Sequence, residues 1–160
     1  MSRERALAAL DAAGLTYRVV EHGPVGSLAE AAVARGVEAA DVIKTLVVRR
    51  GDDDYLFVLV PGDRTISWPK LRALLGVSRL SMPDAAAAKE ATGYERGTIT
   101  PFGSVRPWPV IADERMGGRT VTLGGGAHGV AVLVEADAVV PALGAIVADV
   151  TEAEGTTPNG

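Results

Sequence analysis

The sequence lacks cysteine and has no long uncharged apolar run. Because its 160 residues include no cysteine, it can form no disulfide framework, thiolate nucleophile or cysteine-ligated zinc site. The apolar region 130–150 is interrupted by Glu135, Asp137 and Asp149, so it falls short of the about 18 uncharged residues of a membrane span. The opening MSRERALAALDAAG lacks the apolar core of a signal peptide. We therefore expect a cytoplasmic protein with no membrane partner.

Common catalytic and metal-binding motifs are also missing. The sequence contains no G-x-S-x-G nucleophile turn, no G-x-x-x-x-G-K-[ST] phosphate loop and no H-E-x-x-H zinc helix. His22 and His128 are its two histidines, which argues against a histidine-rich metal site. We expect no bound metal and no cofactor.

The charge argues against a protein that grips a long nucleic acid by its phosphates. The net charge is -4 and the isoelectric point is near 5.2, whereas such binding requires a dense basic surface. The sign is uneven, because residues 64–119 hold nine Lys or Arg against five Asp or Glu. These counts agree equally well with a local basic patch and with an ordinary solvated surface.

Length and patterning predict one α+β domain. A chain of 160 residues, 48% of them hydrophobic, suits a single core. Helical and strand-like patterns alternate, but the polar turn at 50–54 lies between two apolar runs and indicates at least one hairpin. We expect a single domain over 1–150, with a mixed, curled, barrel-like β-sheet flanked by helices. We expect the polar tail, 151–160, to be disordered.

Caps and turns set the boundaries of the expected elements. Ser27 and Glu30 form a capping box, and Gly36, Gly76 and Gly93 are placed to end helices. The predicted helices span 2–13, 27–36, 67–76, 83–93 and 137–143. The predicted strands span 16–20, 42–49, 55–60, 110–113, 120–123, 130–135 and 145–150.

Lys44 stands in the middle of the apolar run DVIKTLVV, at 41–48. In a strand, side chains alternate between faces, so Lys44 shares a face with Val42, Leu46 and Val48. Either that face meets water or the ammonium group has a function. A solvated lysine on a partly exposed strand is the commoner of the two.

A glycine-rich stretch, LGGGAHG at 123–129, satisfies the pattern G-x-G-x-x-G. A dinucleotide-binding loop must open a helix, but the strand-like VAVLVE follows here, so we reject that interpretation. Two alternatives stay open. The glycines allow backbone N–H groups to approach a ligand, or the stretch is a plain hairpin with His128 at its tip.

A second glycine-containing loop, GYERGTITPFG, occupies 93–103. It is too long for a simple turn, and long loops that combine glycine and proline are often functional. The alternative is a surface connection held in place by inward packing of Tyr94 and Phe102.

The lysine strand and the two loops occur in an order that resembles a known family. Together with LFVLVPGDRTIS after the lysine strand and PVIADE after the second loop, they are similar to the YbaK / prolyl-tRNA synthetase-associated editing domain family, over about 16–150. Members of that family hydrolyse a wrong amino acid from tRNA, often from tRNA for proline. The resemblance implies catalytic roles for Lys44 and His128. It implies substrate-binding positions at Thr45, Gly97, Thr98, Ile99, Thr100, Pro101, Asp113, Gly124, Gly125 and Gly126.

The family's chemistry agrees with the missing nucleophile. An aminoacyl ester is activated, so a site has only to position water, stabilise the oxyanion and orient the terminal adenosine. Glycine N–H groups can supply the oxyanion contacts, and Lys44 can hold a phosphate or the carbonyl oxygen. His128 is chemically able to act as a base or to orient water or the substrate amino group.

The resemblance also bears on substrate and partners. The cysteine-specific branch typically has basic residues where this chain has Ala127-His128, so a small amino acid is expected, alanine first, with serine, threonine and cysteine as competitors. A cysteine-specific deacylase that uses the substrate thiol, a non-catalytic binding or regulatory module and a hydrolase of another small ester stay open. The implied partners are the aminoacyl-tRNA acceptor end and an aminoacyl-tRNA synthetase. Candidate phosphate contacts are Arg64, Lys70, Arg72 and Arg96.

Overall fold

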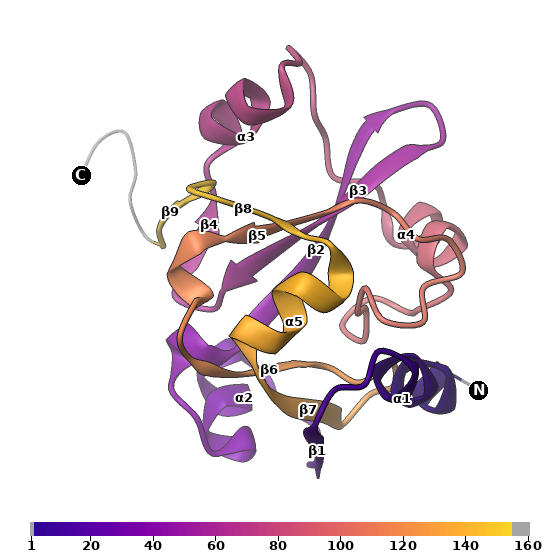
Figure 1. Cartoon of the computed structure of the whole chain (residues 1–160), viewed down its shortest axis with the longest axis vertical. Coiled ribbons are helices and arrows are strands. Elements are labelled where there is room, and N and C mark those ends of the chain that lie inside the picture. Colours follow the sequence, from indigo (N-terminus) through magenta and orange to yellow (C-terminus); the bar gives the residue numbers. More distant parts are fainter. Residues whose placement is uncertain (1, 155–160) are drawn as a thin grey trace.

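Three hydrogen-bonded sheets and five α-helices make up residues 2–154, which the computed structural model describes (Figure 1). The four-stranded sheet has the order β2 (Ile43–Gly51), β3 (Asp54–Pro61), β5 (Val110–Asp113), β8 (Ile146–Ala148). β2 and β3 pair antiparallel, whereas β3–β5 and β5–β8 pair parallel. The predicted hairpin and the predicted mixed sheet are therefore confirmed.

A second sheet is wholly antiparallel. Its order is β1 (Tyr17–Glu21), β7 (Val130–Glu135), β6 (Thr120–Gly124). One isolated bridge, Val42 to Thr122, connects the start of β2 to β6. Beyond that bridge the two sheets are not hydrogen-bonded to each other in the described part of the chain.

The predicted barrel-like sheet is therefore wrong. Inward-facing side chains of both sheets, including Val47 and Phe57 from one and Leu123 and Val132 from the other, belong to one apolar cluster. The sheets face each other across this shared core, with α5 between them (Figure 1). Burial of the two inner faces in one core removes any need for the strands to close into a ring.

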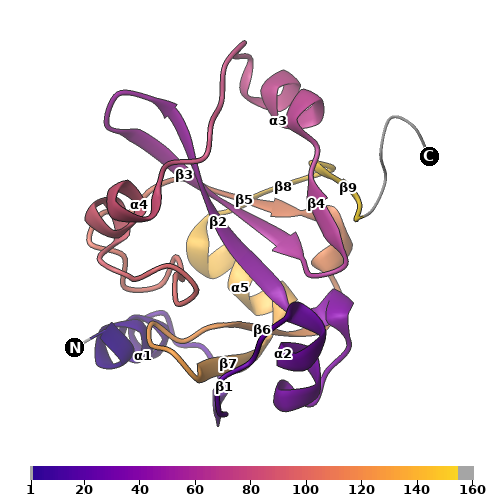
Figure 2. The same cartoon turned by 180° about the vertical axis from the view of Figure 1, so that it is seen from behind.

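Five α-helices surround or separate the sheets, in the described residues. They are α1 (Ser2–Ala12), α2 (Leu28–Arg35), α3 (Trp68–Leu75), α4 (Ala85–Thr92) and α5 (Ala136–Leu143), with short 3-10 turns at Ala39–Asp41 and Glu114–Met116. Figure 2 shows α2 beside the start of β2, and α3 at the opposite end of the molecule from α1. No helix in residues 2–154 is long and apolar enough to cross a membrane.

The Ser27 half of the predicted capping box is present, whereas the Glu30 carboxylate accepts a hydrogen bond from the Gly26 N–H instead of the Ser27 N–H. The side chains of Ser27, Ser67 and Asp84 each accept a hydrogen bond from a backbone N–H in the first turn of α2, α3 and α4. Gly36 and Gly76 follow the C-terminal ends of α2 and α3 with φ of +73° and +67°, a conformation that favours glycine. Capping side chains and glycines with positive φ thus determine where these helices begin and end.

β3 is buried on both of its faces. Along β3, Phe57 and Leu59 point into the core shared with the second sheet. Leu56, Val58 and Val60 point the other way and pack with Leu71 of α3. This alternation explains why β3 reads as a continuous apolar run.

The third sheet pairs β4 (Arg64–Ile66) with β9 (Thr151–Ala153) in antiparallel register. The predicted disordered tail, 151–160, therefore needs correction at its start, because Thr151 to Ala153 form a strand whose backbone hydrogen-bonds to β4. The rest of that predicted tail, 155–160, lies outside the described residues.

Candidate functional site

The two glycine loops pack against each other. The Gly126 N–H donates to the Thr98 carbonyl over 3.2 Å, and a Cβ on Gly124 would lie 3.0 Å from the Ile99 carbonyl oxygen. A Cβ on Gly97 would lie 3.9 Å from Cε1 of His128. The structure thus brings the predicted segments Gly97–Pro101 and Gly124–His128 together.

The 93–103 loop is held in shape by two of its own aromatic residues. Tyr94 and Phe102 are both buried, and the Tyr94 hydroxyl donates to the Phe102 carbonyl over 2.6 Å. The Arg5 guanidinium of α1 lies 4.6 Å from the Tyr94 ring centroid. Both aromatic residues thus pack inward, as the alternative interpretation of this loop expected, and this packing gives the loop a fixed shape.

Several backbone N–H groups predicted to bind substrate already have partners. The Gly125 N–H donates to Val130 over 2.9 Å, and the Thr98 N–H donates to Glu95 over the same distance. The Gly126 N–H donates to the Thr98 carbonyl. In contrast, no hydrogen bond within residues 2–154 uses the N–H of Gly97, Ile99 or Thr100. The predicted oxyanion contacts from glycine N–H groups are therefore open to Gly97 and not to Gly125 or Gly126, and Ile99 and Thr100 are further candidates.

A cleft of about 360 Å³ opens beside His128. The imidazole is 71% exposed, and its Nε2 lies 3.3 Å from Oε2 of Glu95. The other carboxylate oxygen, Oε1, lies 3.6 Å from the Lys89 ammonium. The lining comes from the start of α1, the end of α4 and both loops: Ser2, Arg3, Glu4, Lys89, Gly93, Glu95, Thr98, Gly126, Ala127 and His128. Glu95 was not among the predicted site residues, although its place three residues before Thr98 puts it in the same loop.

Lys44 lies apart from this cleft. Its ammonium donates to the Arg64 carbonyl of β4 over 2.6 Å, on the sheet face where Leu46 and Val48 pack. The prediction that Lys44 shares a face of the strand with Leu46 and Val48 is therefore confirmed. Burial lowers the pKa of Lys44, and the carboxylates of Glu154 and Asp63 partly oppose that shift.

Thr45 occupies the other face of β2. That face also carries Ile43 and Val47, which belong to the apolar cluster against which Ile99 packs. The Thr45 Oγ1 is shielded from solvent, and it has no hydrogen-bond partner within the described residues. A shielded polar atom without a partner is uncommon in folded proteins, so Thr45 has hydrogen-bonding capacity to offer a ligand.

Asp113 is an internal anchor. Its fully buried carboxylate accepts hydrogen bonds from the Thr151 hydroxyl at 3.0 Å, from the Val150 N–H at 3.3 Å, and from Arg115 through Nη1 at 3.1 Å and the backbone N–H at 3.2 Å. These donors occupy both carboxylate oxygens. The geometry therefore favours a role in holding the β8–β9 segment over the predicted contact with substrate.

Asp113→Asn is expected to lower the free energy of unfolding by about 2 kcal/mol, because an amide NH₂ would face donors and leave them unpaired. Urea unfolding measures this loss. Activity well below the melting temperature should stay within about twofold of wild type if the role is structural. An unchanged stability with a raised KM would instead place Asp113 in the substrate site.

The predicted phosphate contacts fall into two groups. Arg64 donates to the Thr151 hydroxyl over 2.7 Å, and Lys70 forms an ion pair with Asp149 at 3.0 Å. These two side chains are thus engaged within the fold. Arg72 lines a separate cleft of about 600 Å³, and Arg96 is exposed beside Gly97. In residues 2–154, no group of three or more His, Cys, Asp and Glu is placed to hold a metal ion.

Comparison with known proteins identifies what this arrangement is similar to. The sequence model of the aminoacyl-tRNA editing domain matches residues 22–140. The proline–tRNA ligase of Thermosipho melanesiensis is 35% identical over 98 residues, which cover 61% of this chain and 17% of that enzyme. The chain thus spans about a sixth of the length of such ligases.

Two further relatives match over most of their length. The multifunctional Ser/Thr-tRNA deacylase ProXp-y of Escherichia coli K12 is 27% identical over 116 residues, covering 71% of this chain and 70% of that protein. A crystal structure of a protein proposed to be a trans-editing enzyme for prolyl-tRNA synthetase superposes with a TM-score of 0.87 at 29% identity. That match covers 94% of this chain and 97% of the other.

Proposed function

The chain belongs to the aminoacyl-tRNA editing domain family, and on this premise we propose that it is a trans-editing deacylase that hydrolyses the ester between a small amino acid and tRNA. The observation that carries the proposal is the packed pair of glycine loops. These loops present unengaged N–H groups, among them those of Ile99 and Thr100, and the loops border the cleft that holds His128.

The reaction needs no protein nucleophile. Water attacks the carbonyl carbon, the carbonyl oxygen becomes an oxyanion, and the ribose oxygen leaves with a proton. We assign the oxyanion contacts to the N–H groups of Ile99 and Thr100, because they are fixed in a closed loop and require no reorganisation. The Thr45 hydroxyl is the further polar group that we assign to the bound ester.

His128 is placed to hold the attacking water or the amino group of the substrate. As a neutral imidazole it can accept a proton from water. Glu95, 3.3 Å from Nε2, is suited to orient the ring.

Lys44 must change partner to reach the ester. β2 is an edge strand of its sheet, so a long lysine side chain can pass around the strand once it leaves the Arg64 carbonyl. A charge-assisted hydrogen bond to the terminal phosphate or to the carbonyl oxygen would replace the contact that it gives up.

Size selects the substrate. An editing site must reject the correct amino acid, and a compact pocket rejects larger groups most effectively. Alanine is therefore the leading substrate. Serine and threonine are close competitors, since the E. coli relative is named for them. Cysteine is a further competitor.

We propose proline tRNA as the tRNA from which the small amino acid is removed, because the relatives include proline–tRNA ligases. We assign the editing unit to 1–150 together with β9, its site of action to the cytoplasm, and its partners to the tRNA acceptor end and a proline–tRNA ligase. The ligase is expected to deliver the tRNA, since an acidic chain binds RNA weakly.

Release of radiolabelled alanine from alanyl-tRNA, compared with hydrolysis of alanine methyl ester, tests the proposal. A deacylase cleaves the tRNA ester and leaves the methyl ester nearly untouched, because the adenosine is needed for positioning. Equal cleavage of both would indicate a general small-ester hydrolase. Binding of the tRNA without release would indicate a non-catalytic module.

Gly97→Val is expected to slow hydrolysis about tenfold with a smaller effect on stability than Gly126→Val. Both glycines have positive φ, of +88° and +85°. The site near Gly97 has room, since its nearest neighbour is a His128 atom at 3.9 Å, whereas a Cβ at Gly126 would meet the Ser2 carbonyl oxygen at 2.7 Å.

Melting temperatures and single-turnover rates of the two variants separate these effects. If Gly97→Val loses as much stability as Gly126→Val and keeps its rate in the folded fraction, the 93–103 loop is only a connection.

A further inference from the structure

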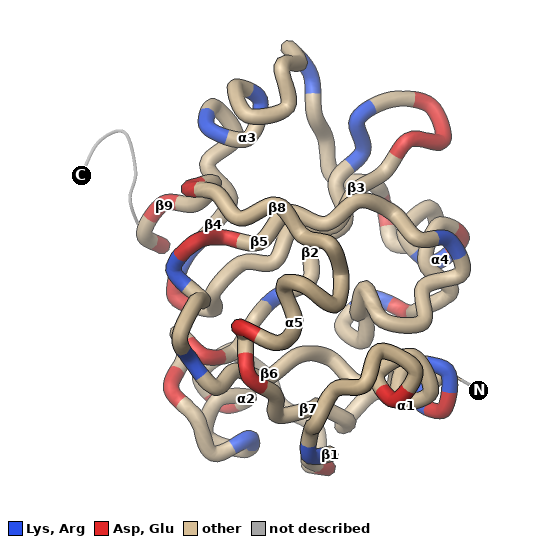
Figure 3. The backbone as a smooth tube through the Cα atoms, in the orientation of Figure 1, with Lys and Arg blue, Asp and Glu red and all other residues tan. Residues whose placement is uncertain are grey.

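Arg5 of α1 binds main-chain oxygens instead of a carboxylate. The start of α1 carries charged residues of both signs, as Figure 3 shows, but Arg5 forms no ion pair within residues 2–154. Its guanidinium is half-buried. Nε donates to the Gly103 carbonyl over 2.5 Å, and Nη2 donates to the Thr92 carbonyl over 3.4 Å. These hydrogen bonds compensate for the loss of water around the charge.

The two carbonyl groups stand at the two ends of the 93–103 loop. Thr92 is the last residue of α4, directly before the loop, and Gly103 is the last residue of the loop. One guanidinium reaches both because its N–H donors point in several fixed directions in one plane. The same group lies over the ring of Tyr94, inside the loop. Arg5 thus ties the two ends of the loop to each other and to α1.

Three loop glycines leave the space that α1 occupies. A Cβ on Gly93 would lie 2.5 Å from Nη2 of Arg5, and a Cβ on Gly103 would lie 2.7 Å from the Arg5 carbonyl oxygen. In the second glycine loop, which Figure 1 and Figure 2 show beside α1, a Cβ on Gly126 would lie 2.7 Å from another carbonyl oxygen of this helix. A side chain at any of these positions would displace the guanidinium or push α1 away. These glycines therefore serve the close approach of α1.

The loop that Arg5 holds is the loop that presents unengaged N–H groups. Gly97, Ile99 and Thr100 lie in its middle. Donors stabilise an oxyanion most when they already stand in position and need no reorganisation during the reaction. Donors on a loop reach that precision only when contacts around them fix the loop. Arg5 does not line the cleft at His128, so it acts on the reaction through the loop and not by touching the ester.

We propose that Arg5 is a positioning residue for ester hydrolysis and that α1 is a working part of the site, because it fixes the loop that binds the oxyanion. This proposal rests on the proposed deacylase function. The editing-domain model matches residues 22–140, so the match assigns no role to α1. The start of the helix also lines the cleft at His128, through Ser2, Arg3 and Glu4.

Arg5→Ala tests this role, with Ala8→Gly as the matched control. Ala8 is exposed on α1, so glycine there weakens the helix and removes only a solvated methyl group. The values of kcat and KM on alanyl-tRNA are measured well below the melting temperature of each variant. Arg5→Ala should lower kcat about tenfold and change KM less than about twofold, because the lost contact acts on the transition state. Ala8→Gly should lower the melting temperature and leave kcat unchanged. Equal kcat values in the two variants would overturn the proposal.

Arg5→Lys is a milder variant that keeps the positive charge. A lysine can remain over the Tyr94 ring, but its compact ammonium group lacks the planar fork that reaches both ends of the loop. We expect Arg5→Lys to melt closer to wild type than Arg5→Ala and still to lose kcat about fivefold. A wild-type kcat in Arg5→Lys would show that the paired contact with Thr92 and Gly103 is not needed, which contradicts the proposal.

Amide hydrogen exchange separates this proposal from the function on which it rests. The N–H of Thr98 is hydrogen-bonded within its loop, and the N–H of Gly126 is hydrogen-bonded across the two loops, so their exchange rates report loop opening. Without substrate, Arg5→Ala should accelerate exchange at both residues about tenfold, and Ala8→Gly should not. If wild type does not hydrolyse alanyl-tRNA, the deacylase function fails, and the exchange rates still decide whether Arg5 holds the loop. Unchanged exchange in Arg5→Ala would overturn the proposal whatever the activity.

Discussion

Lys44→Ala is expected to slow ester hydrolysis about a hundredfold and to leave the fold intact. Loss of a charge contact made in the transition state costs about 3 kcal/mol, which corresponds to that change in rate. In the structure, the ammonium makes one side-chain hydrogen bond, to the Arg64 carbonyl. Solvent can replace this partner for the half-buried side chain, so the stability loss should be small.

Lys44→Met is the matched control, because it keeps most of the apolar stem and removes the charge. Single-turnover deacylation of alanyl-tRNA and thermal unfolding are measured for both variants. Both should be equally slow and close to wild type in melting temperature. If Lys44→Met retains wild-type activity, the charge is not used, and Lys44 serves only to tie β2 to β4.

His128→Ala should slow cleavage of alanyl-, seryl- and threonyl-tRNA by a factor on the order of 100. This is the lower range for loss of a group that transfers a proton or orients water. The exposed ring contacts Glu95 and borders the cleft, so its removal should change the melting temperature little. Glu95→Gln should give a smaller loss of the same kind, because it acts only through the orientation of the ring.

The effect of His128→Ala on cysteinyl-tRNA distinguishes water-mediated hydrolysis from attack by the substrate thiol. Water-mediated hydrolysis requires His128 for every accepted substrate, so cysteinyl-tRNA should lose rate with the others. If the substrate thiol attacks its own ester, that substrate alone escapes the effect. Rapid wild-type cleavage of cysteinyl-tRNA only, unchanged in His128→Ala, would restore the cysteine-specific alternative.

Features set by neighbouring residues were predictable from the sequence. The caps at Ser27, Ser67 and Asp84 and the β2–β3 hairpin depend on interactions over a few residues or on one polar turn. The face of Lys44 followed from the alternation of side chains along a strand. The physical cause of each of these features lies in residues that are close together in the sequence.

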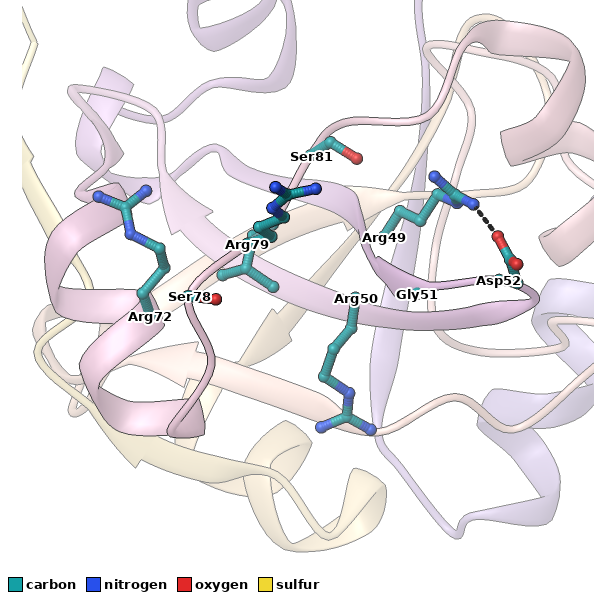
Figure 4. Close-up of a pocket in the computed structure, with 9 residues that line it drawn as sticks. Arg49, Arg50, Gly51, Asp52, Arg72, Ser78, Arg79 and Ser81 are labelled. Atoms are coloured by element: carbon teal, nitrogen blue, oxygen red, sulfur yellow. Dashed lines mark hydrogen bonds and ion pairs between the residues drawn. The ribbon is translucent and has the colours of Figure 1, made fainter.

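Features that depend on distant partners were not predictable in the same way. The buried role of Asp113 arises from Val150 and Thr151, 37 and 38 residues further along the chain. The occupied N–H of Gly126 depends on Thr98. The cleft that Arg72 lines requires the connection after α3 to lie against β2 (Figure 4), and the sequence showed only an excess of basic residues. The apolar pattern likewise predicted strands but not whether their sheets close or face each other.

The rate of ester hydrolysis on proline tRNA carrying alanine, compared with the same tRNA carrying proline, tests the central claim most directly. Wild-type protein and both esters are compared in single-turnover reactions at equal concentrations. A compact editing site predicts that the alanyl ester is cleaved on the order of a hundredfold faster or more, because proline is excluded by size. Equal cleavage of both esters, or no cleavage of either, would contradict the account.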